Sequence, residues 1–140
     1  MYKFLLSLHV LGAVLLIGPF VLLGFLGDRA IRRADAEEIR RGARYMARFA
    51  IGSAVVAVLG AATLGLSDRY TFGTPWVLVS VVLWLVAMGV ATGLTVPSLR
   101  RAADKVEQGD LGGLAGRVVG SSAIVLVLFV VITILMVVRP

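Results

Sequence analysis

Four long stretches of the chain carry no charged side chain, and short charged segments separate them. The uncharged stretches cover residues 4–26, 49–67, 70–99 and 118–138. About 20 helical residues cross a hydrocarbon core of roughly 30 Å, so each stretch is long enough to span a membrane. In the third stretch, Thr74 can cap a helix and Pro75 suits its first turn. The pattern predicts an all-α, four-transmembrane-helix bundle with spans at about 4–26, 49–67, 75–98 and 118–138.

Composition supports this interpretation. Hydrophobic residues make up 59% of the chain, and its mean hydropathy is +0.98. This hydrophobic fraction is well above that of ordinary globular proteins. No segment is long enough to form a separate soluble domain, so residues 1–140 are expected to be a single membrane domain. The chain has no cysteine, which excludes disulfides, thiolate metal sites and cysteine nucleophiles.

The basic residues predict the orientation. Eleven of them lie in the loops after the first and third spans, whereas Lys3, Arg69 and Arg139 are on the other side. The positive-inside rule therefore places both loops in the cytoplasm and both termini outside. The first stretch is longer than a signal-peptide core and is expected to remain as a helix. The bias towards Arg, Gly, Ala and Val is typical of bacteria, which predicts a multi-pass protein of the bacterial cytoplasmic (inner) membrane.

The net charge of +6 does not indicate nucleic-acid binding, because the basic residues flank apolar segments. Asp35 can cap a helix whose third residue is Glu38. That helix would carry Arg40, Arg44 and Arg48 on one face. Such a row of like charges favours contact with anionic lipid headgroups of the inner leaflet.

Small residues predict where helices pack closely. They recur at four-residue spacing in the second, third and fourth spans: Ser53, Ala57, Ala61 and Gly65; Gly89 and Gly93; Gly116 and Gly120. This spacing lets helix backbones approach each other. The contacts are expected mainly to close the four-helix bundle, and a homodimer is the alternative.

Prolines and the single histidine are the other notable features of the spans. Pro19, after Gly18, is expected to kink the first span and free a carbonyl near Leu15, whereas Pro97 is expected to end the third span. His9 is the one titratable residue inside a span. It predicts either a structural or interfacial side chain, partly hydrated near the outer interface, or a ligand for a metal or a group that carries a proton.

The segment around His9 also carries a family resemblance. Residues 8–20, Leu-His-Val-Leu-Gly-Ala-Val-Leu-Leu-Ile-Gly-Pro-Phe, resemble the first helix of small, uncharacterised bacterial four-helix "predicted integral membrane protein" families. These are distantly similar to copper-resistance-D-like proteins and to the four-helix membrane protoporphyrinogen oxidase. The resemblance implies that His9 could hold haem b or copper. The chain departs from those relatives in having Ile17 where they have Trp, and no further histidine.

Three functional hypotheses follow. The first is a non-catalytic accessory or assembly subunit without a cofactor, because the spans contain no acid–base pair and no nucleophile with a base. The second is a haem- or copper-binding redox protein, with His9 supplied by two protomers or paired with Met88. The third is a channel or transporter for a small solute, suggested only by the break at Gly18–Pro19.

Overall fold

The protein is entirely helical over the part of the chain that the computed structural model describes, residues 1–109 and 113–138. Arg139, used above to predict orientation, lies outside the described residues. The elements are α1 (Tyr2–Gly12), η1 (Ala13–Ile17), α2 (Gly18–Arg32), α3 (Ala36–Gly65), α4 (Pro75–Val90), η2 (Ala91–Thr95), α5 (Val96–Val106) and α6 (Leu114–Val138), where η marks a π-helical segment.

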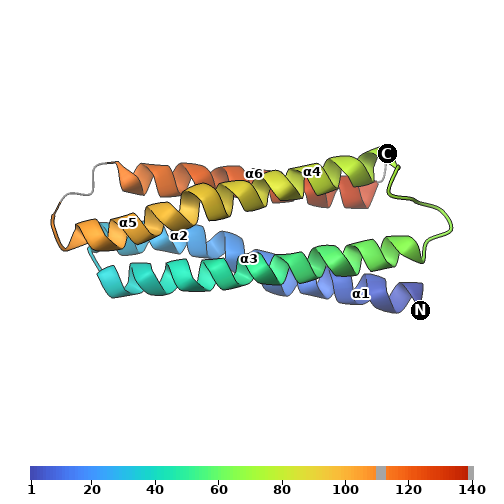
Figure 1. Cartoon of the computed structure of the whole chain (residues 1–140), viewed down its shortest axis with the longest axis horizontal. Helices are drawn as coiled ribbons and strands as arrows, with labels where there is room; N and C mark the ends of the chain where they lie inside the picture. Colours follow the sequence, from blue (N-terminus) through green and yellow to red (C-terminus); the bar gives the residue numbers. More distant parts are fainter. Residues whose placement is uncertain (110–112, 139–140) are drawn as a thin grey trace.

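These elements join into four continuous helices that are long and apolar enough to cross a membrane: Tyr2–Arg32, Ala36–Gly65, Pro75–Val106 and Leu114–Val138. The predicted four-helix architecture is confirmed. Each helix is longer than its predicted span, although the second predicted span extends past the end of its helix at Gly65. The four lie side by side along the long axis of the molecule (Figure 1).

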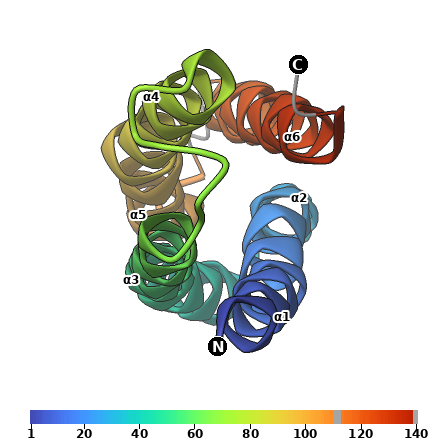
Figure 2. The ribbon, with the colours of Figure 1, turned by 90° about the vertical axis from the view of Figure 1, so that its right-hand side faces the viewer.

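The two ends of the bundle differ in how the helices pair. We call the end that holds the start of α1 and the 66–74 segment the termini end, and the opposite end the loop end (Figure 1). Towards the termini end α1 packs on α3 and α4 packs on α6, whereas towards the loop end α2 packs on α6 and α3 on α5. Figure 2 looks onto the termini end, where the α1–α3 and α4–α6 pairs stand apart. The first two long helices therefore pack against the last two at the loop end, and the two pairs separate towards the termini end.

Local sequence signals explain where the second and third long helices begin. Asp35 is the N-cap of α3, and its carboxylate accepts a hydrogen bond from the Glu38 amide at 2.9 Å, as predicted. Thr74 occupies the N-cap position of α4, with Pro75 in the first turn. The Thr74 hydroxyl, however, accepts from the Thr71 amide at 3.0 Å, so it closes the preceding turn instead of capping the helix.

The prediction that Pro97 ends the third span is wrong. The helix continues through Pro97 to Val106, and the π-helical η2 ends at Thr95, two residues before this proline. The same arrangement occurs in the first long helix, where η1 precedes Gly18 and Pro19. A proline ring clashes with the carbonyl four residues earlier, and a wider π turn relieves that clash. Both prolines are accommodated inside a continuous helix.

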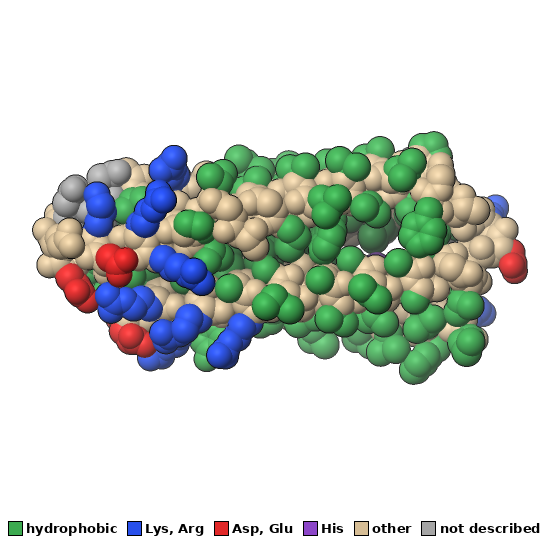
Figure 3. Space-filling model, in the orientation of Figure 1, with side chains coloured by type: hydrophobic (Ala, Val, Ile, Leu, Met, Phe, Trp, Pro, Cys, Tyr) green, Lys and Arg blue, Asp and Glu red, His purple; other side chains and the backbone are tan. Residues whose placement is uncertain are grey.

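The surface supports a membrane location. Valine and leucine side chains are exposed along the middle of the helices, for example Val58 (67%), Leu85 (56%) and Val127 (59%). Figure 3 shows hydrophobic side chains along the middle of the visible face, with most of the Lys, Arg, Asp and Glu side chains at the loop end and a few at the termini end. Water would make such a surface unstable, whereas lipid is a good solvent for it.

The orientation in the membrane is a testable prediction. A reporter that is active only outside the cytoplasm should work when fused after Pro140 and fail when inserted near Asp104, because the loop end carries most of the arginines. Activity measured in intact cells, with expression levels matched by immunoblot, checks this. The reverse pattern would overturn the assignment of the loop end to the cytoplasm.

Candidate functional site

His9 is the only titratable side chain that is buried among the described residues, with 9% of its surface exposed. Its Nδ1 lies 2.8 Å from the carbonyl oxygen of Val56 in α3. Because a carbonyl can only accept, Nδ1 is the donor in this bond, and in the neutral tautomer that makes it the lone pair lies on Nε2. Burial contradicts the expected partial hydration of this side chain, whereas the bond to Val56 agrees with the structural alternative. The imidazole instead joins α1 to α3.

Glycines on α3 and α1 make this contact sterically feasible. A Cβ at Gly60 would lie 2.8 Å from the His9 Cε1, closer than side chains tolerate. A Cβ at Gly52 would lie 3.3 Å from Leu16, and one at Gly12 would lie 3.2 Å from Val56. The α1–α3 interface thus depends on glycines at 12, 52 and 60. We did not predict them from the sequence, although Gly52 and Gly60 lie eight residues apart on one helical face.

The loop end has a second tight interface. A Cβ at Gly24 would lie 2.2 Å from the Ser122 Oγ and 2.8 Å from the Ser122 Cβ, and one at Gly27 would lie 2.5 Å from Leu99. Gly24, Gly27, Leu99 and Ser122 are all buried. The backbone of the first long helix therefore packs directly on side chains of α6 and α5 at Gly24 and Gly27. Such close approach strengthens dispersion contacts between membrane helices.

The predicted glycine pairs are not part of the intramolecular contacts. Gly89, Gly93, Gly116 and Gly120 are exposed, and a Cβ at any of them would meet no atom of the described residues within 4 Å. The expectation that they close the bundle is therefore wrong for a single chain. These spans are apolar on every side, so spacing alone could not identify the buried face.

The predicted row in α3 divides between buried and exposed positions. Ser53 is fully buried, Ala57 and Ala61 are half-buried, and Gly65 is exposed with nothing within 4 Å of an added Cβ. Only the Ser53 end of the row contributes to the interior.

A metal or haem site at His9 stays a prediction. Donation from His9 Nδ1 to a carbonyl fixes the ring with Nε2 available as a ligand. The sulfur of Met88, the suggested second ligand, instead lies 3.0 Å from the Ser53 Oγ, whose proton it shares with the Ala50 carbonyl at 2.7 Å. Ser53 precedes Val56 in α3 by three residues, so it lies about one helical turn nearer the loop end. Within the described residues, no group of three or more His, Cys, Asp or Glu side chains could hold a metal ion. One chain therefore offers one ready ligand.

Comparison with known proteins identifies the family. The model of the family described as "Predicted integral membrane protein (DUF2269)" matches residues 3–140, almost the whole chain. The chain belongs to this family. No curated protein and no solved structure matches it significantly. Family membership and the four apolar helices agree that this is a multi-pass integral membrane protein.

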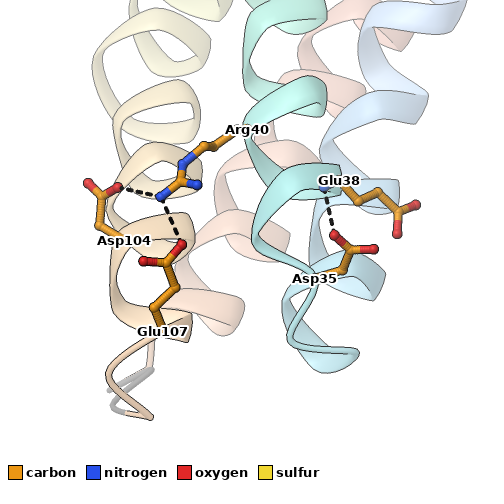
Figure 4. A network of polar contacts seen from close by, with 5 residues as sticks. All are labelled: Asp35, Glu38, Arg40, Asp104 and Glu107. Carbon is orange, nitrogen blue, oxygen red and sulfur yellow. Dashed lines mark hydrogen bonds and ion pairs between the residues drawn. The ribbon is translucent and has the colours of Figure 1, made fainter.

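This DUF2269 protein carries its arginine row on α3 at the loop end. Arg40 lies 3.4 Å from Asp104 and 3.2 Å from Glu107, both on the neighbouring chain segment after η2 (Figure 4). Arg44 lies 3.2 Å from Glu37. Carboxylates, rather than lipid phosphates alone, therefore relieve the repulsion along the row. Contact with lipid headgroups stays a prediction, and it applies best to Arg48, which makes no ion pair within the described part of the chain.

Proposed function

We propose that this protein is a non-catalytic accessory or assembly subunit of the bacterial cytoplasmic membrane, acting through contacts with lipid and with other membrane chains. The observation that carries the proposal is the hydrogen bond from His9 to the Val56 carbonyl. It commits the single buried titratable side chain of the described residues to joining two helices. A general acid or base must be within hydrogen-bond reach of its substrate, and this imidazole nitrogen is already bound inside the fold.

The hydroxyl groups within the helices also support a structural role. Thr63, Ser80 and Thr133 each donate to the carbonyl four residues earlier at 2.8 Å. Such bonds satisfy a hydroxyl inside its own helix and leave no base next to a nucleophile. The outward-facing glycines of α4, η2 and α6 give a neighbouring helix room for close approach. A homodimer or a larger complex is therefore part of the proposal.

A haem- or copper-binding redox protein is the second candidate. It is favoured by the orientation of His9, because a ring that donates from Nδ1 to a carbonyl presents Nε2 to a metal. A bound haem or copper would supply the redox chemistry, while the chain would supply one imidazole and an apolar surround. A site with two imidazoles would need His9 from each of two chains.

The solute-channel hypothesis loses its supporting signal. It rested on a break at Gly18–Pro19, but Tyr2–Arg32 is one continuous helix. Discontinuous helices are what expose backbone groups to a transported solute.

Purified wild type and the variant His9→Gln distinguish the two candidates. Cells are grown with added haem precursor and copper, and the protein is measured by absorbance, metal analysis and intact mass. We expect a colourless wild type and an unchanged spectrum in His9→Gln, with stability lowered by about 1 kcal/mol for the altered hydrogen bond. A stoichiometric Soret or copper band that disappears in His9→Gln would replace the first proposal with the second. In that case the melting temperature of His9→Gln should fall by more than the lost hydrogen bond explains, because the cofactor stabilises the wild-type protein that binds it.

A further inference from the structure

A groove runs along the surface between α3 and the third long helix. It encloses about 360 Å³. Its wall on α3 consists of small residues, Ala47, Ala50 and Ala54, together with Ile51. We call this feature the alanine groove. It forms where α3, which packs against α5 at the loop end, begins to separate from α4.

The opposite wall is a straight row of side chains from the third long helix. Trp84, Met88, Thr92, Val96 and Arg100 follow one another at four-residue intervals. At 1.5 Å per residue, the row is roughly 24 Å long. Half of a hydrocarbon core is roughly 15 Å thick. The row is therefore longer than one leaflet is thick. A fatty acyl chain that starts beside Arg100 could lie in the groove over the full thickness of that leaflet.

The middle of the groove offers no unsatisfied polar group. The Thr92 hydroxyl donates to the Met88 carbonyl at 2.6 Å, and the Ser53 hydroxyl beside the Met88 sulfur donates to the Ala50 carbonyl at 2.7 Å. The remaining wall between Trp84 and Arg100 is apolar. At this depth the surrounding solvent is lipid, so an acyl chain fills the groove better than water does.

The loop-end mouth of the groove is cationic. Arg100 lines it, and Arg48 directly follows Ala47 of the opposite wall. Neither arginine makes an ion pair within residues 1–109 and 113–138, whereas Arg40 and Arg44 on the same helix face are paired with carboxylates. Neither arginine at the mouth is therefore held by a carboxylate of the described protein. A phosphate group supplies oxygen acceptors that match guanidinium donors.

We propose that the alanine groove binds one anionic phospholipid of the leaflet at the loop end. One acyl chain lies between the alanines of α3 and the row from Met88 to Val96, and the phosphate lies against Arg48 and Arg100. The site is distinct from His9 and does not depend on whether that residue holds a cofactor. It would give the protein a preference for phosphatidylglycerol-type lipids over neutral ones.

Native mass spectrometry of the full chain in detergent tests the site. The protein is titrated with phosphatidylglycerol or with phosphatidylcholine of the same acyl chains. We expect one phosphatidylglycerol to remain bound under conditions that remove phosphatidylcholine. Arg100→Gln and Arg48→Gln should each weaken retention by about fivefold. Arg29→Gln, which removes the same charge from α2, should have no such effect.

A second pair of variants tests the apolar wall. Ala54 is exposed, so Ala54→Leu fills the groove without crowding the core, and it should weaken binding of phosphatidylglycerol. Ala62→Leu changes another exposed alanine of α3 outside the groove and is the matched control. Equal retention of the two lipids, or unchanged retention in both Arg100→Gln and Ala54→Leu, would overturn the proposal. Thermal unfolding of each variant without added lipid confirms that the bundle is intact.

Discussion

Replacing Gly24 with alanine is expected to destabilise the protein strongly, although it adds a single methyl group. That methyl would overlap the Ser122 Oγ and Cβ, which lie 2.2 and 2.8 Å from the position that the new carbon would take. The Ser122 Cβ is fixed to the α6 backbone, so the helices must move apart. Overpacking of this kind costs about 1–3 kcal/mol. Thermal or denaturant unfolding in detergent measures the loss.

A matched substitution should have the opposite effect. Gly89 lies in α4 with nothing within 4 Å of an added Cβ. Alanine is favoured over glycine in a helix by up to about 1 kcal/mol, so Gly89→Ala should be neutral or stabilising. The double variant Gly24→Ala with Ser122→Gly should recover part of the loss, because it removes both colliding atoms. Equal destabilisation by Gly24→Ala and Gly89→Ala would show that the α2–α6 interface is not as tight as described.

These two glycines also show what the sequence could and could not predict. The four spans follow from the length of the uncharged stretches, and the start of α3 follows from Asp35 and Glu38. All of these signals are local. Which face of a span is buried is not local: lipid-facing and core positions are both apolar in a membrane helix, so hydrophobic periodicity does not separate Gly24 from Gly89.

The predictions of a helix end at Pro97 and of a partly hydrated His9 were wrong for related reasons. A proline usually limits a helix in water, but a membrane helix continues through it when a π-helical turn such as η2 makes room. The partner of His9 is a backbone carbonyl, which every residue possesses and which leaves no mark in the sequence. Only the packing of α1 on α3 identifies Val56 as that partner. The candidate site could therefore be predicted as a residue, but its environment could not.

The α1–α3 interface provides the second large expected effect. Gly60→Ala would place a methyl carbon 2.8 Å from the His9 Cε1 and 3.1 Å from its Nδ1. The ring would have to leave the Val56 carbonyl, and a buried N–H without a partner costs about 1–3 kcal/mol. We expect a clear fall in unfolding temperature. Gly42→Ala, on the same helix with nothing within 4 Å of the added carbon, should cause no fall.

Combining Gly60→Ala with His9→Ala separates this mechanism from a general effect on α3. His9→Ala alone should destabilise the protein, because it removes a buried ring and leaves a cavity beside Val56. In that background the added methyl at position 60 meets no imidazole and partly fills the cavity, so Gly60→Ala should become neutral or stabilising. The change of sign would be a coupling free energy between His9 and Gly60, measurable by a double-mutant cycle. If Gly60→Ala is equally harmful with and without the imidazole, then His9 does not pack on Gly60. The hydrogen bond to Val56, and with it the structural role proposed for His9, would then have to be abandoned.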